Sequence, residues 1–216
     1  MKQKFSAAFI LLISFILWTL ILLTVDLQPI GPMQSYVGLA SVNAWFHNLT
    51  GVHMALYEIT DLLSIIPLGI VLCFGIMGLI QWIFRRSIRL VDYDILVLGG
   101  FYGVVMGLFL LFEICVVNYR PILIEGIPEA SYPSSTTMLV ICVIPTAMMQ
   151  CHSRIKNPAA RRGLLFILGI FMLLMVIGRL LSGVHWLTDI IGGALLSAGL
   201  VMLYDSICCL NAKTSL

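Results

Sequence analysis

Six long apolar segments constrain this chain more than any other feature of its sequence. A helix needs about 20 apolar residues to cross a bilayer core of roughly 30 Å. The chain supplies them, because 61% of its 216 residues are hydrophobic and only 10% are charged. We therefore expect an all-α integral membrane protein, a single six-helix transmembrane bundle over residues 1–216. The predicted spans are Phe5–Val25, Leu62–Phe84, Ile95–Val117, Ser134–Met149, Leu164–Leu181 and Ile190–Ile207.

Lysine and arginine predict the orientation of these spans, because cytoplasmic loops carry an excess of both. If the six helices alternate in direction, all but two of the twelve lysines and arginines fall on one side, together with both termini. We predict that this side is cytoplasmic. The two exceptions, Arg120 and Arg179, lie on the outer side, where topology does not explain them.

Composition also argues against some classes of partner. The net charge is +2 and there is no long basic run, so we expect no nucleic-acid partner. None of the six cysteines has the spacing of a metal ligand pair, and we expect no metal and no other cofactor.

The first outer loop, residues 26–61, is long and contains no lysine or arginine. Apolar residues recur in it at helical spacing. One interpretation is an amphipathic helix in the outer interface, anchored by Trp45 and Phe46. The alternative is an ordinary helix packed within the loop. The apolar positions are Leu39, Val42, Trp45, Phe46 and Leu49.

Three short stretches with unusual polar residues fall at the outer ends of the predicted helices, over residues 118–121, 132–136 and 178–189. The third contains His185 and Asp189, whose i, i+4 spacing places both on one face of a helical turn. A carboxylate bonded to one imidazole nitrogen fixes the tautomer and leaves the other nitrogen free to attack. A lone interfacial histidine would be unremarkable, but this pair beside two isolated arginines favours catalysis.

The two arginines are candidates for holding an anion. A guanidinium group matches phosphate with two parallel hydrogen bonds. The alternative is that Arg120 and Arg179 form salt bridges, because intramembrane charges often pair with one another. The candidate acidic partners are Glu113, Glu125, Glu129 and Asp189.

The second stretch has the pattern of a helix start. Pro133 is expected in the first turn and the hydroxyls of Ser134, Ser135 and Thr136 near the cap. Free backbone N–H groups and the positive end of the helix dipole form an anion site there. Simple capping and anion binding are compatible with each other.

These stretches resemble the type 2 phosphatidic acid phosphatase superfamily, which includes bacterial undecaprenyl-pyrophosphate phosphatases. The family pattern is Lys, six residues, Arg-Pro; then Pro-Ser-Gly-His; then Ser-Arg, five residues, His, three residues, Asp. Its third part is matched by Arg179, His185 and Asp189, with Gly178 in place of the first serine. The resemblance implies that His185 is the nucleophile and that Asp189 orients it. It also implies that Arg120, Arg179 and Ser134 bind phosphate. The anion site at the helix start adds Ser135 and Thr136 to the predicted phosphate-binding residues.

The chain departs from the family pattern at two positions. The family lysine falls at Glu113, and the family histidine that protonates the leaving oxygen falls at Thr136. Losing a general acid typically costs about 10²–10⁴ in rate. A phosphate leaving group, with a second pKa of about 6, can leave without a proton, so the departure favours a lipid pyrophosphate substrate. A substitute acid is the alternative, and the sequence leaves six candidates open: His47, His53, Tyr119, Tyr132, Glu125 and Glu129.

We therefore expect a lipid-phosphate phosphatase of the cell membrane, from a bacterial host, with its site facing outside. It would hydrolyse a polyprenyl pyrophosphate or a glycerolipid phosphate through a phosphohistidine intermediate. The alternatives are a lipid phosphotransferase and a degenerate protein that binds lipid phosphate without turnover. A small transporter or channel subunit fits less well, because the charges cluster at one face instead of lining the membrane thickness.

Overall fold

A computed structural model describes residues 2–214 of the chain, with the side chains of residues 3–210. The described part is helical, and its β-structure is limited to isolated bridges. Six helical segments are long and apolar enough to cross a membrane, which confirms the predicted fold class. The helices are α1 (Lys2–Thr24), α2 (Ala40–Thr50), α3 (Met54–Leu63), α4 (Ile65–Arg85), α5 (Tyr93–Ile114), α6 (Ser135–Arg154), α7 (Pro158–Leu181) and α8 (Leu187–Thr214).

The boundaries of several spans differ from the prediction. The second span begins at Met54, because α3 runs almost directly into α4 and the two form one apolar segment of 32 residues. The stretch from Met54 to Asp61 is therefore helical and was wrongly assigned to the outer loop. The fifth and sixth spans begin at Pro158 and Leu187, earlier than hydropathy alone predicted.

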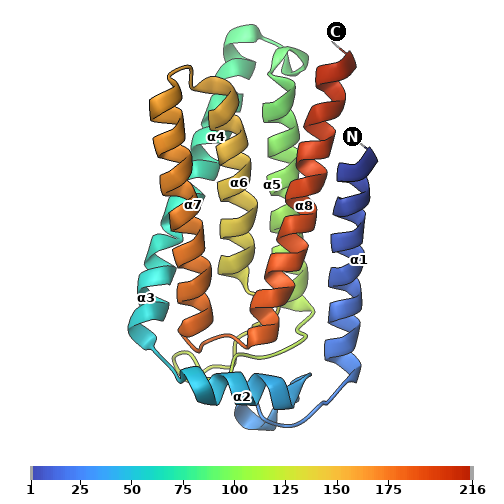
Figure 1. The fold of residues 1–216 in the computed structure, drawn as a ribbon, viewed down its shortest axis with the longest axis vertical. Helices are drawn as coiled ribbons and strands as arrows, with labels where there is room; N and C mark the ends of the chain where they lie inside the picture. The colour runs from blue at the N-terminus through green and yellow to red at the C-terminus, as the bar shows by residue number, and fades with distance from the viewer. Residues whose placement is uncertain (1, 215–216) are drawn as a thin grey trace.

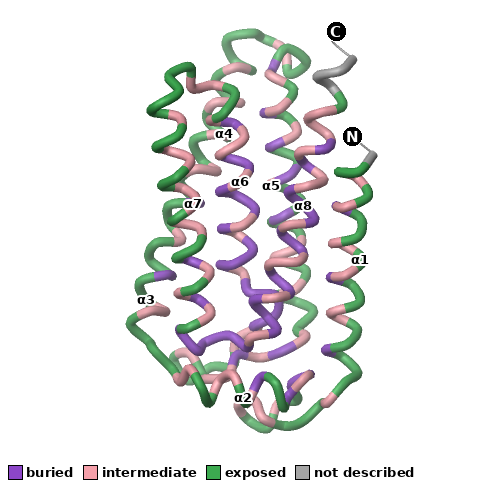
Figure 2. Tube along the Cα trace, in the orientation of Figure 1, coloured by how far each residue is buried: buried purple, intermediate pink, exposed green. Residues whose placement is uncertain are grey.

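Helices α6 and α8 form the centre of the bundle. Figure 2 shows buried backbone concentrated along both helices and in the connections at the end remote from the termini. Helix α8 packs against α1, α5 and α6. Its Tyr204 packs with Phe101 of α5, and Leu22 of α1 belongs to the same core. The outer helices α1, α4 and α7 expose mainly apolar side chains, as helices in contact with lipid do.

The two ends of the bundle differ in character. Both termini and the α4–α5 and α6–α7 connections lie at one end (Figure 1). Ion pairs gather there, including Lys4–Asp205 at 2.6 Å and Arg154–Asp94 at 2.7 Å. The three stretches identified in the sequence all lie at the opposite end. This arrangement agrees with alternating spans, and the cytoplasmic assignment of the termini stays a prediction.

Helix α2 lies across the end of the bundle remote from the termini (Figure 1). It exposes Val42, Trp45 and Leu49 and buries the polar Asn43. The Asn43 amide donates to Thr188 Oγ1 at 3.0 Å, and its oxygen accepts from the Thr188 backbone N–H at 3.3 Å. An apolar face directed away from the bundle favours the interfacial-helix interpretation. Helix α2 also satisfies a backbone donor in the first turn of α8.

Candidate active site

His185 and Asp189 meet at the start of α8, and Ser131 lies between them. The Ser131 hydroxyl is 3.0 Å from His185 Nδ1 and donates to Asp189 Oδ2 at 2.5 Å. His185 Nδ1 and Asp189 Oδ2 are themselves 3.9 Å apart. All three residues are buried. The histidine and the carboxylate are therefore joined through a serine that the sequence analysis did not identify.

The prediction that His185 and Asp189 lie on the same helical turn is wrong. His185 lies in the loop before α8, which begins at Leu187, and only Asp189 is helical. A hydrogen bond from nitrogen to oxygen usually spans about 2.7–3.2 Å, so the 3.9 Å separation leaves a gap that Ser131 fills. Ser131 is one residue before the Tyr132–Pro133 pair, and nothing in its spacing predicted this contact.

The Asp189 carboxylate is held by donors from three segments. Asn118 Nδ2 donates to Oδ1 at 3.2 Å, and the backbone N–H of Trp186 donates to Oδ2 at 3.0 Å. With Ser131, the group accepts three hydrogen bonds and donates none, as an ionised carboxylate does. Asn118 belongs to the first stretch and Ser131 to the segment before the second, so the loops converge on this one carboxylate.

The imidazole of His185 is arranged as a neutral ring with one free nitrogen. Burial lowers the pKa of His185 well below its usual range, and the positive charges of Arg120 and Arg179 lower it further. Its Nε2 atom is buried and has no hydrogen-bond partner among the described residues. A neutral imidazole with an unengaged nitrogen is able to act as a nucleophile.

Arg120 and Arg179 lie on the same aromatic ring. Their guanidinium carbons are 5.6 and 4.7 Å from the centre of the Tyr57 ring. Arg179 Nη1 also donates to Tyr57 O at 3.3 Å and to Thr60 Oγ1 at 3.2 Å, and Nη2 is 3.4 Å from Asp61. Helix α3 therefore positions this arginine. Tyr57, Thr60 and Asp61 were not predicted as site residues because their segment was assigned to a loop, although their i, i+3 and i+4 spacing is typical of one helix face.

Both arginines have donors that form no hydrogen bond within the described part of the chain. Arg120 Nε is 3.1 Å from a carboxylate oxygen of Glu129, a partner anticipated from the sequence. Arg120 Nη1 and Arg179 Nε are nevertheless buried and have no hydrogen-bond partner there, and the same holds for His185 Nε2. Buried polar atoms are normally paired, and exceptions often have a functional role. The positive charges of Arg120 and Arg179 act on His185, which makes these two cationic donors and the free nitrogen candidates for one anion site.

The predicted phosphate-binding hydroxyls separate into three different environments. Ser134 is the N-cap of α6, with its side chain accepting from Thr137 N at 3.5 Å, and Pro133 lies before the cap and not in the first turn as predicted. Ser134 is fully buried. Ser135 faces the cavity that Arg120 lines, whereas Thr136 faces a neighbouring cavity between α4, α5 and α6.

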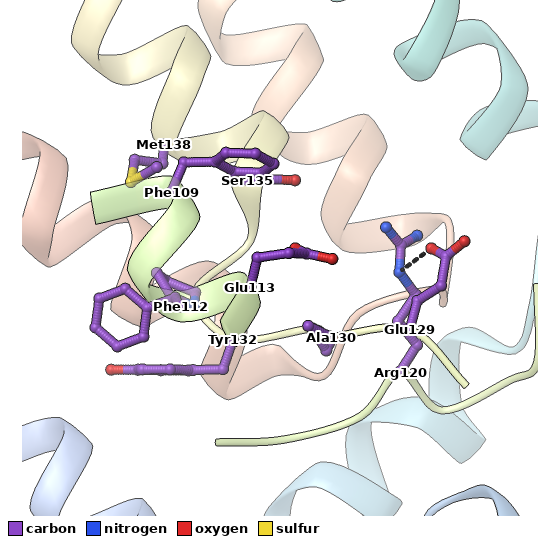
Figure 3. A pocket seen from close by; sticks show the side chains of 11 residues that line it. Phe109, Phe112, Glu113, Arg120, Glu129, Ala130, Tyr132, Ser135 and Met138 are labelled. Atoms are coloured by element: carbon purple, nitrogen blue, oxygen red, sulfur yellow. Dashed lines mark ion pairs between the residues drawn. The ribbon is translucent and has the colours of Figure 1, made fainter. Parts of the chain in front are cut away.

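A small polar cavity of about 40 Å³ lies beside Arg120 (Figure 3). Glu113 and Glu129 both line it, and the Glu113 carboxyl points into the same space as the Arg120–Glu129 pair (Figure 3). Within the described part of the chain Glu113 has no ion pair. Its position next to the anion site makes it a candidate acid that the sequence analysis did not include.

The structure separates the six acids that the sequence left open. Tyr132 and Glu129 line the cavity. The Tyr132 hydroxyl is 2.7 Å from Thr19 Oγ1, and burial raises its pKa, so it is a poor proton donor to the site. His47 packs on Trp186, next to His185 in the chain, and His53, Tyr119 and Glu125 do not line this cavity. The two carboxyl groups that line the cavity are those of Glu129 and the newly identified Glu113.

Comparison with known proteins agrees with this geometry. The family model of the PAP2 superfamily matches residues 70–207, which is more than half of the chain and includes all three stretches. The chain belongs to the PAP2 superfamily. No curated protein matches it.

The PAP2 fold extends beyond the matched region. A similar solved structure is the first transmembrane PAP2 type phosphatidylglycerolphosphate phosphatase from Bacillus subtilis. The TM-score is 0.64 at 18% identity, over 93% of this chain and 94% of that one. At this identity the likeness establishes the fold, which is that of a transmembrane lipid phosphatase. Substrate and mechanism have to be argued from the site.

Proposed function

We propose that this protein is a phosphatase of lipid phosphates or pyrophosphates that acts at the outer membrane face through a phosphohistidine at His185. One observation carries the proposal. Among the described residues, His185 Nε2, Arg120 Nη1 and Arg179 Nε are all buried without a hydrogen-bond partner, at the same end of the bundle. A phosphoryl group between them would accept from both arginines and present its phosphorus to the imidazole.

The residues divide the chemistry between them. His185 Nε2 forms a bond to phosphorus, and the bond to the leaving oxygen breaks with its electron pair. Arg120 and Arg179 hold the equatorial oxygens, where charge accumulates. Water then attacks phosphorus, the bond to Nε2 breaks, and the neutral imidazole is restored. Ser135 and the free N–H groups at the start of α6 are the further donors available to the phosphate.

A lipid substrate is supported by the cavity next to the anion site. This cavity of about 270 Å³ lies between α4, α5 and α6 and is mainly apolar. It shares Phe109, Ser135 and Met138 with the polar cavity beside Arg120. A phosphate held by Arg120 would therefore place the attached chain against apolar side chains within the bilayer.

The leaving group distinguishes among lipid substrates. Thr136 occupies the position of the family acid and cannot donate a proton near neutral pH. A lipid pyrophosphate releases a phosphate that needs no proton, whereas a lipid monophosphate releases an alkoxide that does. We therefore favour a polyprenyl pyrophosphate over a glycerolipid monophosphate.

A second candidate function is binding of lipid phosphate without turnover. Glu113 favours it, because a carboxylate in the polar cavity repels a phosphate dianion where the family has a lysine. The free Nε2 of His185 opposes it, since simple binding needs no unengaged nucleophile.

The test is phosphate release by the purified protein in detergent with chelator present. The substrates are undecaprenyl pyrophosphate and phosphatidic acid, and His185→Ala is the control. We expect release that disappears in the variant and a faster rate with the pyrophosphate. Acid-labile phosphate trapped on His185 would establish the intermediate. A folded protein that binds either lipid and forms no phosphoenzyme would support the binding function instead.

A further inference from the structure

Ser131 occupies the position where a histidine-based nucleophile usually meets its carboxylate. We infer that the Ser131 hydroxyl is a positioning residue that fixes the tautomer of His185 and links its developing charge to Asp189. The inference rests on the proposed function of His185 as the nucleophile. It adds a residue to which the family pattern quoted above assigns no role, although Ser131 also lines the polar cavity beside Arg120.

The hydrogen-bond directions follow from counting protons. Asp189 Oδ2 is 2.5 Å from Ser131 Oγ, and an ionised carboxylate only accepts, so the serine hydroxyl proton points to Asp189. Ser131 Oγ then has only lone pairs to offer to His185 Nδ1, 3.0 Å away. Nδ1 must therefore carry the ring proton, which leaves the lone pair on Nε2, the atom with no partner.

The same chain of hydrogen bonds acts during the reaction. When Nε2 bonds to phosphorus, the imidazole loses the electron density of its lone pair and becomes positively charged. The Nδ1–H bond to Ser131 strengthens, and the serine passes the polarisation to the Asp189 carboxylate. No proton has to leave the ring. The P–O bond breaks with its electron pair on the leaving oxygen, and hydrolysis of the P–Nε2 bond returns the pair to the ring.

In the observed arrangement, the Asp189 carboxylate cannot stabilise the charged His185 ring by a direct hydrogen bond. The 3.9 Å between Nδ1 and Oδ2 exceeds hydrogen-bond range. Asp189 is also held in place by Asn118 and by the Trp186 backbone. Because these bonds fix the carboxylate, it cannot move toward the ring without breaking them, so the serine is the only described group that joins the two.

The experiment compares Ser131→Ala with Ser131→Thr, which keeps the hydroxyl. The matched control is Ser197→Ala, which removes a buried serine hydroxyl of α8 that donates to the backbone carbonyl of Met138 and forms no described hydrogen bond with His185, Asp189 or Ser131. The first readout is the tautomer of His185 by ¹⁵N NMR of histidine-labelled protein at about pH 8, above the ordinary histidine pKa. The His185 signal is assigned with His185→Gln.

We expect a wild-type ring protonated at Nδ1, and a mixture of tautomers in Ser131→Ala only. The second readout is the rate of phosphoenzyme formation. By analogy with outer partners of ligating histidines, it should fall about 10–10²-fold in Ser131→Ala with KM unchanged. Ser131→Thr should restore both readouts. If Ser131→Ala does not fold, Ser131→Cys is measured in the same way, because a thiol is a weak donor and acceptor.

An unchanged tautomer in Ser131→Ala would overturn the inference, as would a rise in KM without a change in the phosphorylation rate, which would place Ser131 on the phosphate. The tautomer readout needs no turnover. Absence of phosphatase activity in the wild type would therefore refute the proposed function while the NMR comparison still decides the role of Ser131.

Discussion

Arg179 offers the sharpest quantitative test of the anion site. It is almost fully buried, with 1% of its surface exposed, and its Nε donor has no partner among the residues that the structure describes. Substitution by lysine keeps the positive charge but replaces the planar fork with a single ammonium group. The change therefore removes a specific donor to the phosphate and not the charge as such.

The size of the effect follows from the donors that are lost. A hydrogen bond to a charged group contributes about 1.5–3 kcal/mol. If one Nε–H bond to the phosphate is lost, kcat/KM should fall about 10- to 150-fold, since each 1.36 kcal/mol is tenfold. The Nη1 bonds to Tyr57 and Thr60 hold the guanidinium in place. Their loss leaves the ammonium less constrained, so the upper part of the range is expected.

The assay is phosphate release from a lipid pyrophosphate in detergent, with thermal unfolding of each variant measured in parallel. Arg154→Lys is the matched control, because Arg154 is also an ion-paired arginine but lies at the opposite end of the bundle, with Asp94. We expect Arg154→Lys to alter stability and leave kcat/KM within about twofold. If folded Arg179→Lys retains kcat/KM within twofold of the wild type, the assignment of Nε to the phosphate is wrong.

Three further predictions concern pH, the leaving-group acid and the loop that carries the histidine. In the folded protein the pKa of His185 lies well below its ordinary value of 6.5, so the unfolded chain binds a proton on this imidazole at a higher pH than the folded protein does. The free energy of unfolding should therefore decrease below about pH 6.5. Thermal unfolding should show a less steep decrease in His185→Gln. Either Glu113→Gln or Glu129→Gln should slow hydrolysis of a lipid monophosphate by about 10²-fold or more and spare a lipid pyrophosphate, and equal losses on both substrates would contradict an acid role. Gly183 has φ +70°, and a Cβ there would lie 2.1 Å from the backbone oxygen of Gly51, at the end of α2. Gly183→Ala should therefore destabilise the protein by at least about 1 kcal/mol and lower activity. An unchanged melting temperature would refute this prediction.

The apolar segments and the third stretch could be predicted because they are local properties of the sequence. A span of lipid-facing residues needs no knowledge of its neighbours, and α1 and α5 lie close to where hydropathy placed them. Arg179, His185 and Asp189 are likewise close in the sequence, and in the fold they lie around the one connection between α7 and α8.

Helix α3 could not be assigned with the same certainty. Its eight residues before Leu62 include Glu58 and Asp61, which lower the local hydropathy, and the loop contains no lysine or arginine to mark where it ends. In the structure Asp61 is 3.4 Å from Arg179. The charge that lowered the hydropathy of this helix therefore forms an ion pair with an arginine of the site. Polar residues are retained in spans where they pair with a functional charge.

The sequence by itself determined the six spans, their alternation, and the gathering of His185, Arg120 and Arg179 at one end of the bundle. These results depend on hydrophobicity and on the order of residues along the chain. The tertiary structure alone decided which groups join the histidine to its carboxylate and which nitrogen remains free. That outcome depends on contacts of Ser131 with residues 54 and 58 positions away, each within about 3 Å, and such distances are set by packing of the helices and not by spacing in the sequence.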